Sequence, residues 1–268
     1  MSGPKDRPKD APTVTVSLQW QVGDTPLPLE LSVPALPVEP QAILPALRKL
    51  VDEVVAFSVE ALEGTDKTVT CTAGCAACCR QLISISDIEA YAIGAVIERM
   101  PETRRAHVTA RFADAEQRLT ASMAPDAIID ALNGPDRAMF AITYFKYGVA
   151  CPFLEDERCS IYANRPLVCR EYLVHTPVER CLKVGEHGIG VVPISHASKA
   201  LFRLSTIHDT RTQTRVPLSL LPYWMARHRK TVKSADGGAW MIRFVQSMEQ
   251  ADAEEEAAWQ RAKKHEGC

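Results

Sequence analysis

Four of the chain's nine cysteines lie within nine consecutive residues, Cys71-Thr72-Ala73-Gly74-Cys75-Ala76-Ala77-Cys78-Cys79. Packing alone does not require thiols at this density. Cysteines separated by two or three residues can direct several sulfurs at one centre, and thiolates are common ligands of zinc and of iron–sulfur clusters. The glycine and the alanines keep the turn free of bulk, so the backbone can fold closely around an ion. The spacing therefore predicts a metal centre in this stretch.

A second group of cysteines follows farther along the chain: Cys151, Cys159, Cys169 and Cys181. Eight candidate ligands exceed one site, because zinc and a [4Fe-4S] cluster each usually take four. Two neighbouring centres, or one centre with spare or bridging thiolates, both fit this number. Adjacent cysteines such as Cys78 and Cys79 point apart in most backbone conformations, so one of them should find its centre completed by the second group. We therefore expect the two groups to be neighbours in space.

Two of the nine cysteines need separate treatment. Free cysteine is also common as a small buried hydrophobic residue, and this alternative stays open for Cys181, which is far in sequence from Cys169. Cys268 is the terminal residue and is excluded from the predicted ligands.

Three arginines beside the cysteines could balance the negative charge of an all-thiolate site: Arg80, Arg165 and Arg170. We expect them to contact the cofactor, although an ordinary salt bridge is an equal alternative for Arg170. The all-sulfur ligand set favours an iron–sulfur cluster such as [4Fe-4S] over Zn²⁺. The Cys151-Pro152 step, which is similar to the Cys-Pro that closes ferredoxin motifs, points the same way.

Together these motifs resemble the YkgJ-like cysteine-cluster family (CxxCxxCC), described as putative zinc- or iron-chelating proteins and including relatives of flagellin lysine methylases. The matching stretches are residues 71–79, 151–154 and 159–170, and the resemblance covers mainly residues 71–181. The first spacing departs from the family pattern, with three residues instead of two between Cys71 and Cys75. The resemblance implies a metal centre and a protein as substrate or partner.

A competing match is to radical S-adenosylmethionine enzymes, which use the spacing of Cys71, Cys75 and Cys78 for a cluster with one open iron. That motif usually carries an aromatic residue before its third cysteine, where this chain has Ala77. It also usually begins a βα barrel, whereas helical patterns follow here. The cysteine-cluster family is the better match.

Hydrophobic periodicity predicts a mainly α protein with an N-terminal β-hairpin, organised around the metal centre. Residues 1–12 read as a disordered tail, and residues 13–37 alternate as a hairpin that turns at Gly23-Asp24. Residues 38–185 form the predicted metal-binding domain, which opens with a long helix ending at Gly64. Ser86 and Glu89 have the spacing of a capping box. Residues 186–268 add C-terminal helices packed on the same body.

Composition limits the classes of function. The chain has 268 residues, of which 46% are hydrophobic and 24% charged, with a net charge of −2. This is globular composition without the basic excess of a nucleic-acid protein. The sequence has no run of eighteen apolar residues, so it predicts no membrane-spanning helix. The N-terminus does not have the pattern of a secretory signal. We therefore expect a cytoplasmic protein with free thiols. Whether the centre is catalytic stays open: a redox or modification enzyme and a non-catalytic zinc staple or metal carrier both fit, and no catalytic residue is assigned.

Overall fold

The computed structural model describes residues 12–23, 25–186, 188–194, 197–204, 214–228 and 234–266, without the side chains of residue 252 and residues 254–266. The longer helices are α1 (Leu44–Glu63), α2 (Asp87–Glu98), α3 (Glu102–Thr120), α4 (Pro125–Asn133), α5 (Arg137–Lys146) and α9 (Gly237–Glu266). The shorter α-helices are α6 (Leu167–Glu171), α7 (Ala197–Arg203) and α8 (Leu221–Arg227). Five 3-10 helices accompany them among the described residues: η1 (Pro40–Ile43), η2 (Ala77–Arg80), η3 (Tyr162–Asn164), η4 (Val178–Leu182) and η5 (Leu218–Leu220).

The strands form three antiparallel pairs within the described residues. The pairs are β1 (Thr13–Val22) with β2 (Thr25–Pro34), β3 (Ser84–Ser86) with β6 (Arg215–Pro217), and β4 (Leu154–Glu155) with β5 (Arg158–Cys159). The predicted fold class, mainly α with an N-terminal hairpin, is confirmed.

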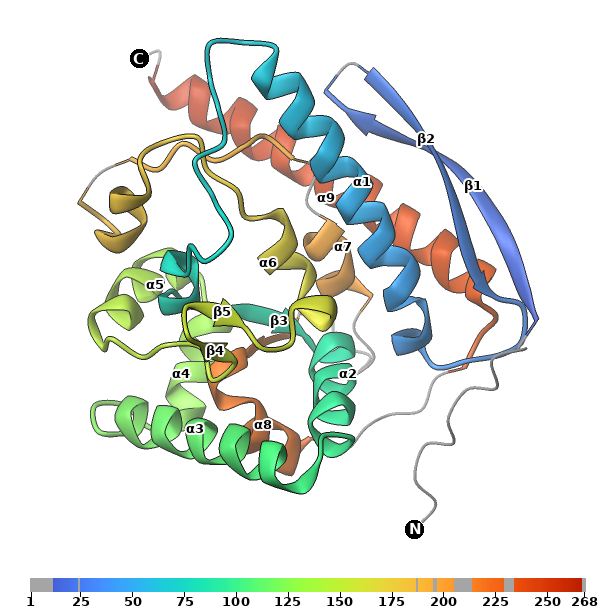
Figure 1. The fold of residues 1–268 in the computed structure, drawn as a ribbon. Coiled ribbons are helices and arrows are strands. Elements are labelled where there is room, and N and C mark those ends of the chain that lie inside the picture. The colour runs from blue at the N-terminus through green and yellow to red at the C-terminus, as the bar shows by residue number, and fades with distance from the viewer. Residues whose placement is uncertain are drawn as a thin grey trace.

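The hairpin packs its apolar face on the helical body, as Figure 1 shows along α1 and α9. Leu29, Leu31 and Val33 of β2 are fully covered, with at most 2% of each side chain exposed. Trp20 of β1 stacks on Phe244 of α9, with ring centroids 6.4 Å apart. A two-stranded hairpin is marginal in water, so this burial is what stabilises it.

Helix α1 lies between the hairpin and the cysteine-bearing segments. Its apolar residues recur at helical spacing, and Leu47, Leu50, Val51 and Val54 are buried. The helix is followed by Gly64, as predicted. Helices α7 and α9 share the same hydrophobic core, because Leu201 and Phe244 pack into one cluster with the α1 residues.

A second apolar cluster lies between α2, α3 and α8. The apolar stripe of α3 is buried, and its Phe112 meets Phe153 edge to face at 5.4 Å between ring centroids. Aromatic pairs of this geometry contribute about 1 kcal/mol beyond the area that they bury. This contact holds the loop that carries Cys151 against α3.

Two buried carboxylates join the helices that surround the cysteines. The predicted capping box is present: Glu89 accepts from the backbone N–H of Ser86 at 3.2 Å, and the Ser86 hydroxyl accepts from the Glu89 N–H at 3.2 Å. The other Glu89 oxygen accepts from the N–H of Leu167 at 2.7 Å, at the first residue of α6. At the last residue of α6, Glu171 accepts from the backbone N–H and hydroxyl of Ser198 in α7, at 3.0 and 2.6 Å. These bonds fix both ends of the short helix that carries Cys169.

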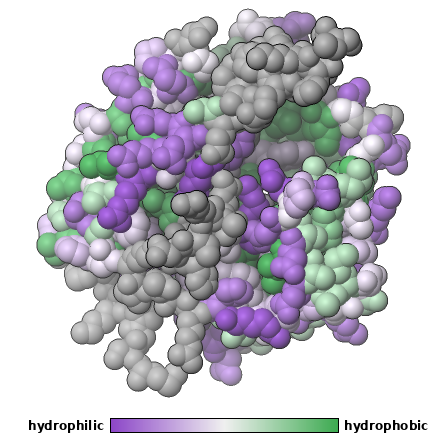
Figure 2. Space-filling view, turned by 180° about the vertical axis from the view of Figure 1, so that it is seen from behind, coloured by the Kyte–Doolittle hydropathy of each residue, from purple (hydrophilic) through white to green (hydrophobic). Residues whose placement is uncertain are grey.

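The structure also contains elements that the periodicity did not predict, namely α4 and the two short strand pairs β3–β6 and β4–β5. The predicted disordered tail lies outside the described residues except for Pro12. The domain boundaries at residues 37 and 185 remain predictions. Within the described part of the chain, no helix combines the length and apolar character needed to cross a membrane. On the face seen in Figure 2, hydrophilic and hydrophobic residues are interspersed outside the grey atoms.

Replacing Glu89 with alanine removes the acceptor of the buried Leu167 N–H. We expect Glu89→Ala to lower the free energy of unfolding by roughly 2–4 kcal/mol, because a buried donor would be left unsatisfied and a helix cap lost. The matched control is Glu98→Ala at the exposed end of the same helix, with an expected change below about 0.5 kcal/mol. Urea denaturation followed by circular dichroism measures both. Similar losses for the two variants would contradict the joining role of Glu89.

Candidate metal centre

The first cysteine group lies on the segment that leaves α1. This segment is fastened to the stretch after α6: Thr70 donates its N–H to the Val174 carbonyl at 3.0 Å and its hydroxyl to the Thr176 carbonyl at 2.6 Å. The Val174 N–H in turn points at the sulfur of Cys71, 3.4 Å away. An N–H directed at a sulfur stabilises a thiolate, so this contact suits a ligand.

The turn between Cys71 and Cys75 depends on Gly74. Its φ of 89° lies in the left-handed region that other residues rarely adopt, and nothing lies within 4 Å of where a Cβ would stand. Glycine is therefore required by backbone conformation rather than by crowding. After the turn, the chain enters η2, which presents Cys78 and Cys79.

The second cysteine group lies directly beside η2. The backbone N–H of Cys151 donates to the carbonyl of Cys79 at 2.7 Å. The side chain of Gln81, the residue after η2, donates to the carbonyl of Cys181 at 3.2 Å. The expected proximity of the two groups is therefore observed.

The cysteines divide over two adjoining regions around η2. Cys71, Cys75 and Cys181 pack into a small apolar cluster with Ala77 and Val174. Cys151 and Cys159 instead pack against the cluster that holds Phe153 and Ile161. Cys169 lies within electrostatic reach of Cys151, Cys159 and Cys78.

Burial governs the protonation of most of these thiols. It raises the pKa of Cys151 to about 12 and that of Cys169 well above its ordinary value, and nearby cysteines add to both shifts. Burial also raises the pKa values of three further thiols, Cys71, Cys159 and Cys181. If these thiols are ligands, a metal would have to displace their protons on binding.

Cys78 is the exception. A hydrogen bond from the Cys79 thiol, helped by backbone N–H groups and the positive charge of Arg165, lowers the pKa of Cys78 to about 7 despite its partial burial. The same bond raises the pKa of Cys79, which keeps the shared proton. These interactions therefore favour the thiolate of Cys78 near neutral pH.

The described cysteine side chains do not converge on a single point in the structure. Among the described residues, no three histidine, cysteine, aspartate or glutamate side chains are arranged to hold a metal ion. The donor chemistry nevertheless fits a thiophilic metal, because η2 carries Cys78 and Cys79 and the backbone of Cys151 binds directly to it. The ligand assignment of Cys71, Cys75, Cys78, Cys79, Cys151, Cys159, Cys169 and Cys181 stays a prediction.

The predicted cofactor-binding arginines occupy different settings. Arg80 is paired with Glu157, with its Nη2 2.6 Å from the carboxylate. Arg170 is 6% exposed and binds both carboxylate oxygens of Asp52 at 2.6 and 2.8 Å, as well as the Ala163 carbonyl at 2.8 Å. The salt-bridge alternative for Arg170 is thus observed, and this bridge fastens α6 to α1. A direct role of either arginine toward a cofactor stays a prediction.

Arg165 differs from the other two. Its guanidinium lies over the ring of Tyr162 at 4.3 Å, and within the described residues its buried Nε has no hydrogen-bond partner. Its charge also acts on Cys78 and Cys159. Of the three predicted arginines, Arg165 is the best placed to balance thiolate charge.

The hairpin β4–β5 contributes residues that the sequence did not single out. Asp156 and Glu157 at its turn have positive φ values of 47° and 56°, which cost free energy for residues other than glycine. Glu155 is bound by Arg104 and Arg111 of α3, the latter at 2.6 Å. Burial raises the pKa of Glu155, but these two arginines outweigh burial and lower it overall. The ion pairs hold the hairpin, and Cys159 with it, in place.

Residues 70–184 match the model of the CxxCxxCC family, described as a putative zinc- or iron-chelating domain. The match spans both cysteine groups and confirms the family resemblance seen in the sequence. No curated protein and no solved structure matches the chain. The family match supports metal binding through the cysteines.

The acidity of Cys78 can be measured in the metal-free protein. We expect its alkylation by iodoacetamide, followed by mass spectrometry of its peptide, to reach half of the maximal rate near pH 7, because only the thiolate reacts. Cys79→Ala removes the hydrogen bond and should move this midpoint upward. An unchanged midpoint in Cys79→Ala would show that the neighbouring thiol is not the cause.

Proposed function

We propose that this chain binds a metal through thiolates of both cysteine groups, and that the centre is an iron–sulfur cluster rather than zinc. The observation that carries the proposal is the hydrogen bond from the Cys151 N–H to the Cys79 carbonyl, because it brings the two groups together around η2. The family match over residues 70–184 supports metal binding independently.

The number and placement of the thiols support more than one ligand set. Cys71, Cys75 and Cys181 form one set, which packs in a cluster with Ala77 of η2. Cys151 and Cys159 pack against a second cluster, and Cys169 interacts electrostatically with both of them. Cys78 acts electrostatically on members of both sets. A cluster bound by four thiolates could therefore take three ligands from either set of cysteines and the fourth, Cys78 or Cys79, from η2.

The choice of iron over zinc rests on the donors and their surroundings. All candidate ligands are sulfurs, and N–H groups and the Arg165 guanidinium lie beside them. The N–H groups and the guanidinium would stabilise any anionic thiolate site, so the preference for iron rests on the all-sulfur donor set and on the Cys151-Pro152 step. Zinc bound by four cysteines is the alternative, and it would use the same residues.

We favour a functional metal centre that solvent can reach over a closed structural site. Seven of the eight cysteines keep part of their surface exposed, Cys71 and Cys75 among them, although burial still raises the pKa values of Cys151 and Cys169. A centre that borders solvent is within reach of another protein, in line with the proposed protein substrate or partner. All eight thiols are free, as suits the reducing cytoplasm that we propose as the location. The radical S-adenosylmethionine alternative has less support, because the strands of the described residues form two-stranded antiparallel pairs rather than a βα barrel.

Serine replacements test whether the second group contributes ligands. Cys151→Ser and Cys159→Ser should lower the metal content as much as Cys75→Ser. They should also cost on the order of a few kcal/mol of stability, because the metal closes a long loop between the groups. Metal analysis and an optical spectrum of anaerobically purified protein give the content and identity. Cys268→Ser, at the excluded cysteine, is the control and should keep full metal.

Two outcomes would change the proposal in different ways. Full metal in Cys151→Ser and Cys159→Ser, together with loss in Cys75→Ser, would restrict the site to the first group. A colourless protein with stoichiometric zinc would overturn the iron assignment and leave the site assignment standing.

A further inference from the structure

The N-terminal hairpin has two edges, and the hydrogen-bonding pattern shows which backbone groups each edge presents. In an antiparallel pair, hydrogen-bonded and non-hydrogen-bonded residue pairs alternate. The Ala35 N–H donates to the Pro12 carbonyl at 2.9 Å, just beyond the pair Thr13–Pro34. From this bonded pair, the alternation directs the backbone groups of odd-numbered β1 residues and even-numbered β2 residues away from the partner strand.

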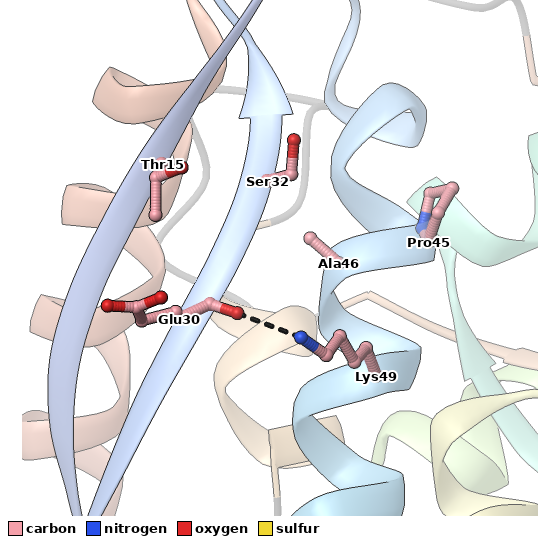
Figure 3. Close-up of a pocket in the computed structure, with 6 residues that line it drawn as sticks. All are labelled: Thr15, Glu30, Ser32, Pro45, Ala46 and Lys49. Carbon is pink, nitrogen blue, oxygen red and sulfur yellow. Dashed lines mark hydrogen bonds between the residues drawn. The ribbon is translucent and has the colours of Figure 1, made fainter.

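The outer edge of β2 is closed. Three of its five outward positions are prolines, Pro26, Pro28 and Pro34, which have no N–H to donate. A fourth, Glu30, has its carbonyl bound by the Lys49 ammonium of α1 at 3.0 Å (Figure 3). Figure 3 also shows α1 facing this edge. A pocket of about 320 Å³ lies between them, lined by Thr15, Glu30, Ser32, Pro45, Ala46 and Lys49. No further strand can add here.

Within the part of the chain that the structure describes, the outer edge of β1 is open from Thr13 to Gln19. Its outward positions include Thr13, Thr15, Ser17 and Gln19, all exposed, and among the described residues no loop or helix hydrogen-bonds to their backbone groups. The ten residues of β1 contain no proline and no charged side chain. Edge strands normally carry proline or charged residues, because these discourage pairing with another strand. The contrast between the two edges of one hairpin favours a partner at β1.

The apolar face of the hairpin is also incompletely covered on the β1 side. Val14 is 43% exposed, and Val16 and Leu18 are half-buried. Their partners on β2 are Val33, Leu31 and Leu29, which are almost completely covered. One more strand beside β1 would lie next to this partly exposed row and extend the covered face.

We propose that β1 pairs antiparallel with β1 of a second copy of this chain, so that two hairpins form one four-stranded sheet. With the twofold axis at Ser17, the outward residues meet each other, Thr15 opposite Gln19 and Ser17 opposite itself. The apolar residues also meet, because Val16 then faces Leu18. Such a contact is isologous, as expected for a symmetric dimer.

The occupant is a second copy because the strand complements itself. An uncharged strand meets no like charges when it faces its own sequence, and this register matches polar with polar and apolar with apolar residues along its length. One strand pair is smaller than a standard interface of about 1,600 Å². We therefore expect a reversible dimer with a dissociation constant in the micromolar range.

The residue on the twofold axis provides the test. Ser17→Glu places two carboxylates opposite each other and next to Glu30, which pairs with Ser17 across each hairpin, so this variant should dimerise at least tenfold more weakly than the wild type. Ser17→Lys should weaken the dimer less, because the two Glu30 carboxylates flank its ammonium groups. A one-to-one mixture of the two should dimerise again, because lysine then faces glutamate. The control is Ser32→Glu, at an exposed outward position of the closed edge, which should keep wild-type dimerisation. Sedimentation equilibrium measures association, and circular dichroism checks that each variant is folded.

Clear outcomes would overturn the proposal. The wild type could remain monomeric at several hundred micromolar, or Ser32→Glu could weaken the dimer as much as Ser17→Glu. Failure of the mixture to dimerise would show that Ser17 does not face itself. Wild-type monomer that nevertheless bound an unrelated extended peptide at β1 would assign this edge to another protein instead.

Discussion

The arrangement of the cysteine-rich region depends on a buried carboxylate, that of Glu89. Burial raises the pKa of this carboxylate, and the hydrogen-bond donors that surround it offset the free-energy cost of burying it. Those donors are the Ser86 N–H and hydroxyl at the start of α2 and the Leu167 N–H at the start of α6. Because all belong to helix ends whose N–H groups lack partners within the helix, one side chain satisfies both ends and fixes their distance. This constraint also positions Cys169, which lies in α6 two residues after Leu167.

The remaining cysteines are positioned by contacts that are far apart in sequence. Arg170 reaches Asp52 across 118 residues, and the Thr70 hydroxyl reaches the Val174 carbonyl across 104. The first bond fastens α6 to α1, and the second ties the stretch before the first cysteine to the stretch after α6. The Cys79 carbonyl accepts the Cys151 N–H. The region is therefore assembled from four chain segments by hydrogen bonds that do not involve a metal. A ligand for the thiols would act on a scaffold already in place.

Sequence patterns predicted the features that local chemistry determines. The hairpin, α1 and the capping box follow from alternation, helical periodicity and the spacing of Ser86 and Glu89. The proximity of the cysteine groups followed from ligand count. Other features could not be predicted, because strand pairs of two or three residues, such as β3–β6, are defined by tertiary contacts rather than by periodicity. The hydrogen bond from the Leu167 N–H to Glu89 could not be predicted from the sequence either, because it joins residues that are 78 positions apart.

Burial and metal binding make opposite demands on the thiols. Burial favours the neutral form and raises the pKa values of Cys151 and Cys169, whereas a metal needs thiolates. The structure relieves this conflict at one place, where the Cys79 thiol and Arg165 favour the thiolate of Cys78. Cys78 also lies where the two regions of thiols adjoin, on the helix that the Cys151 N–H contacts. A metal that first binds this thiolate would bring its own positive charge to the neighbouring thiols, and that charge lowers the cost of removing their protons.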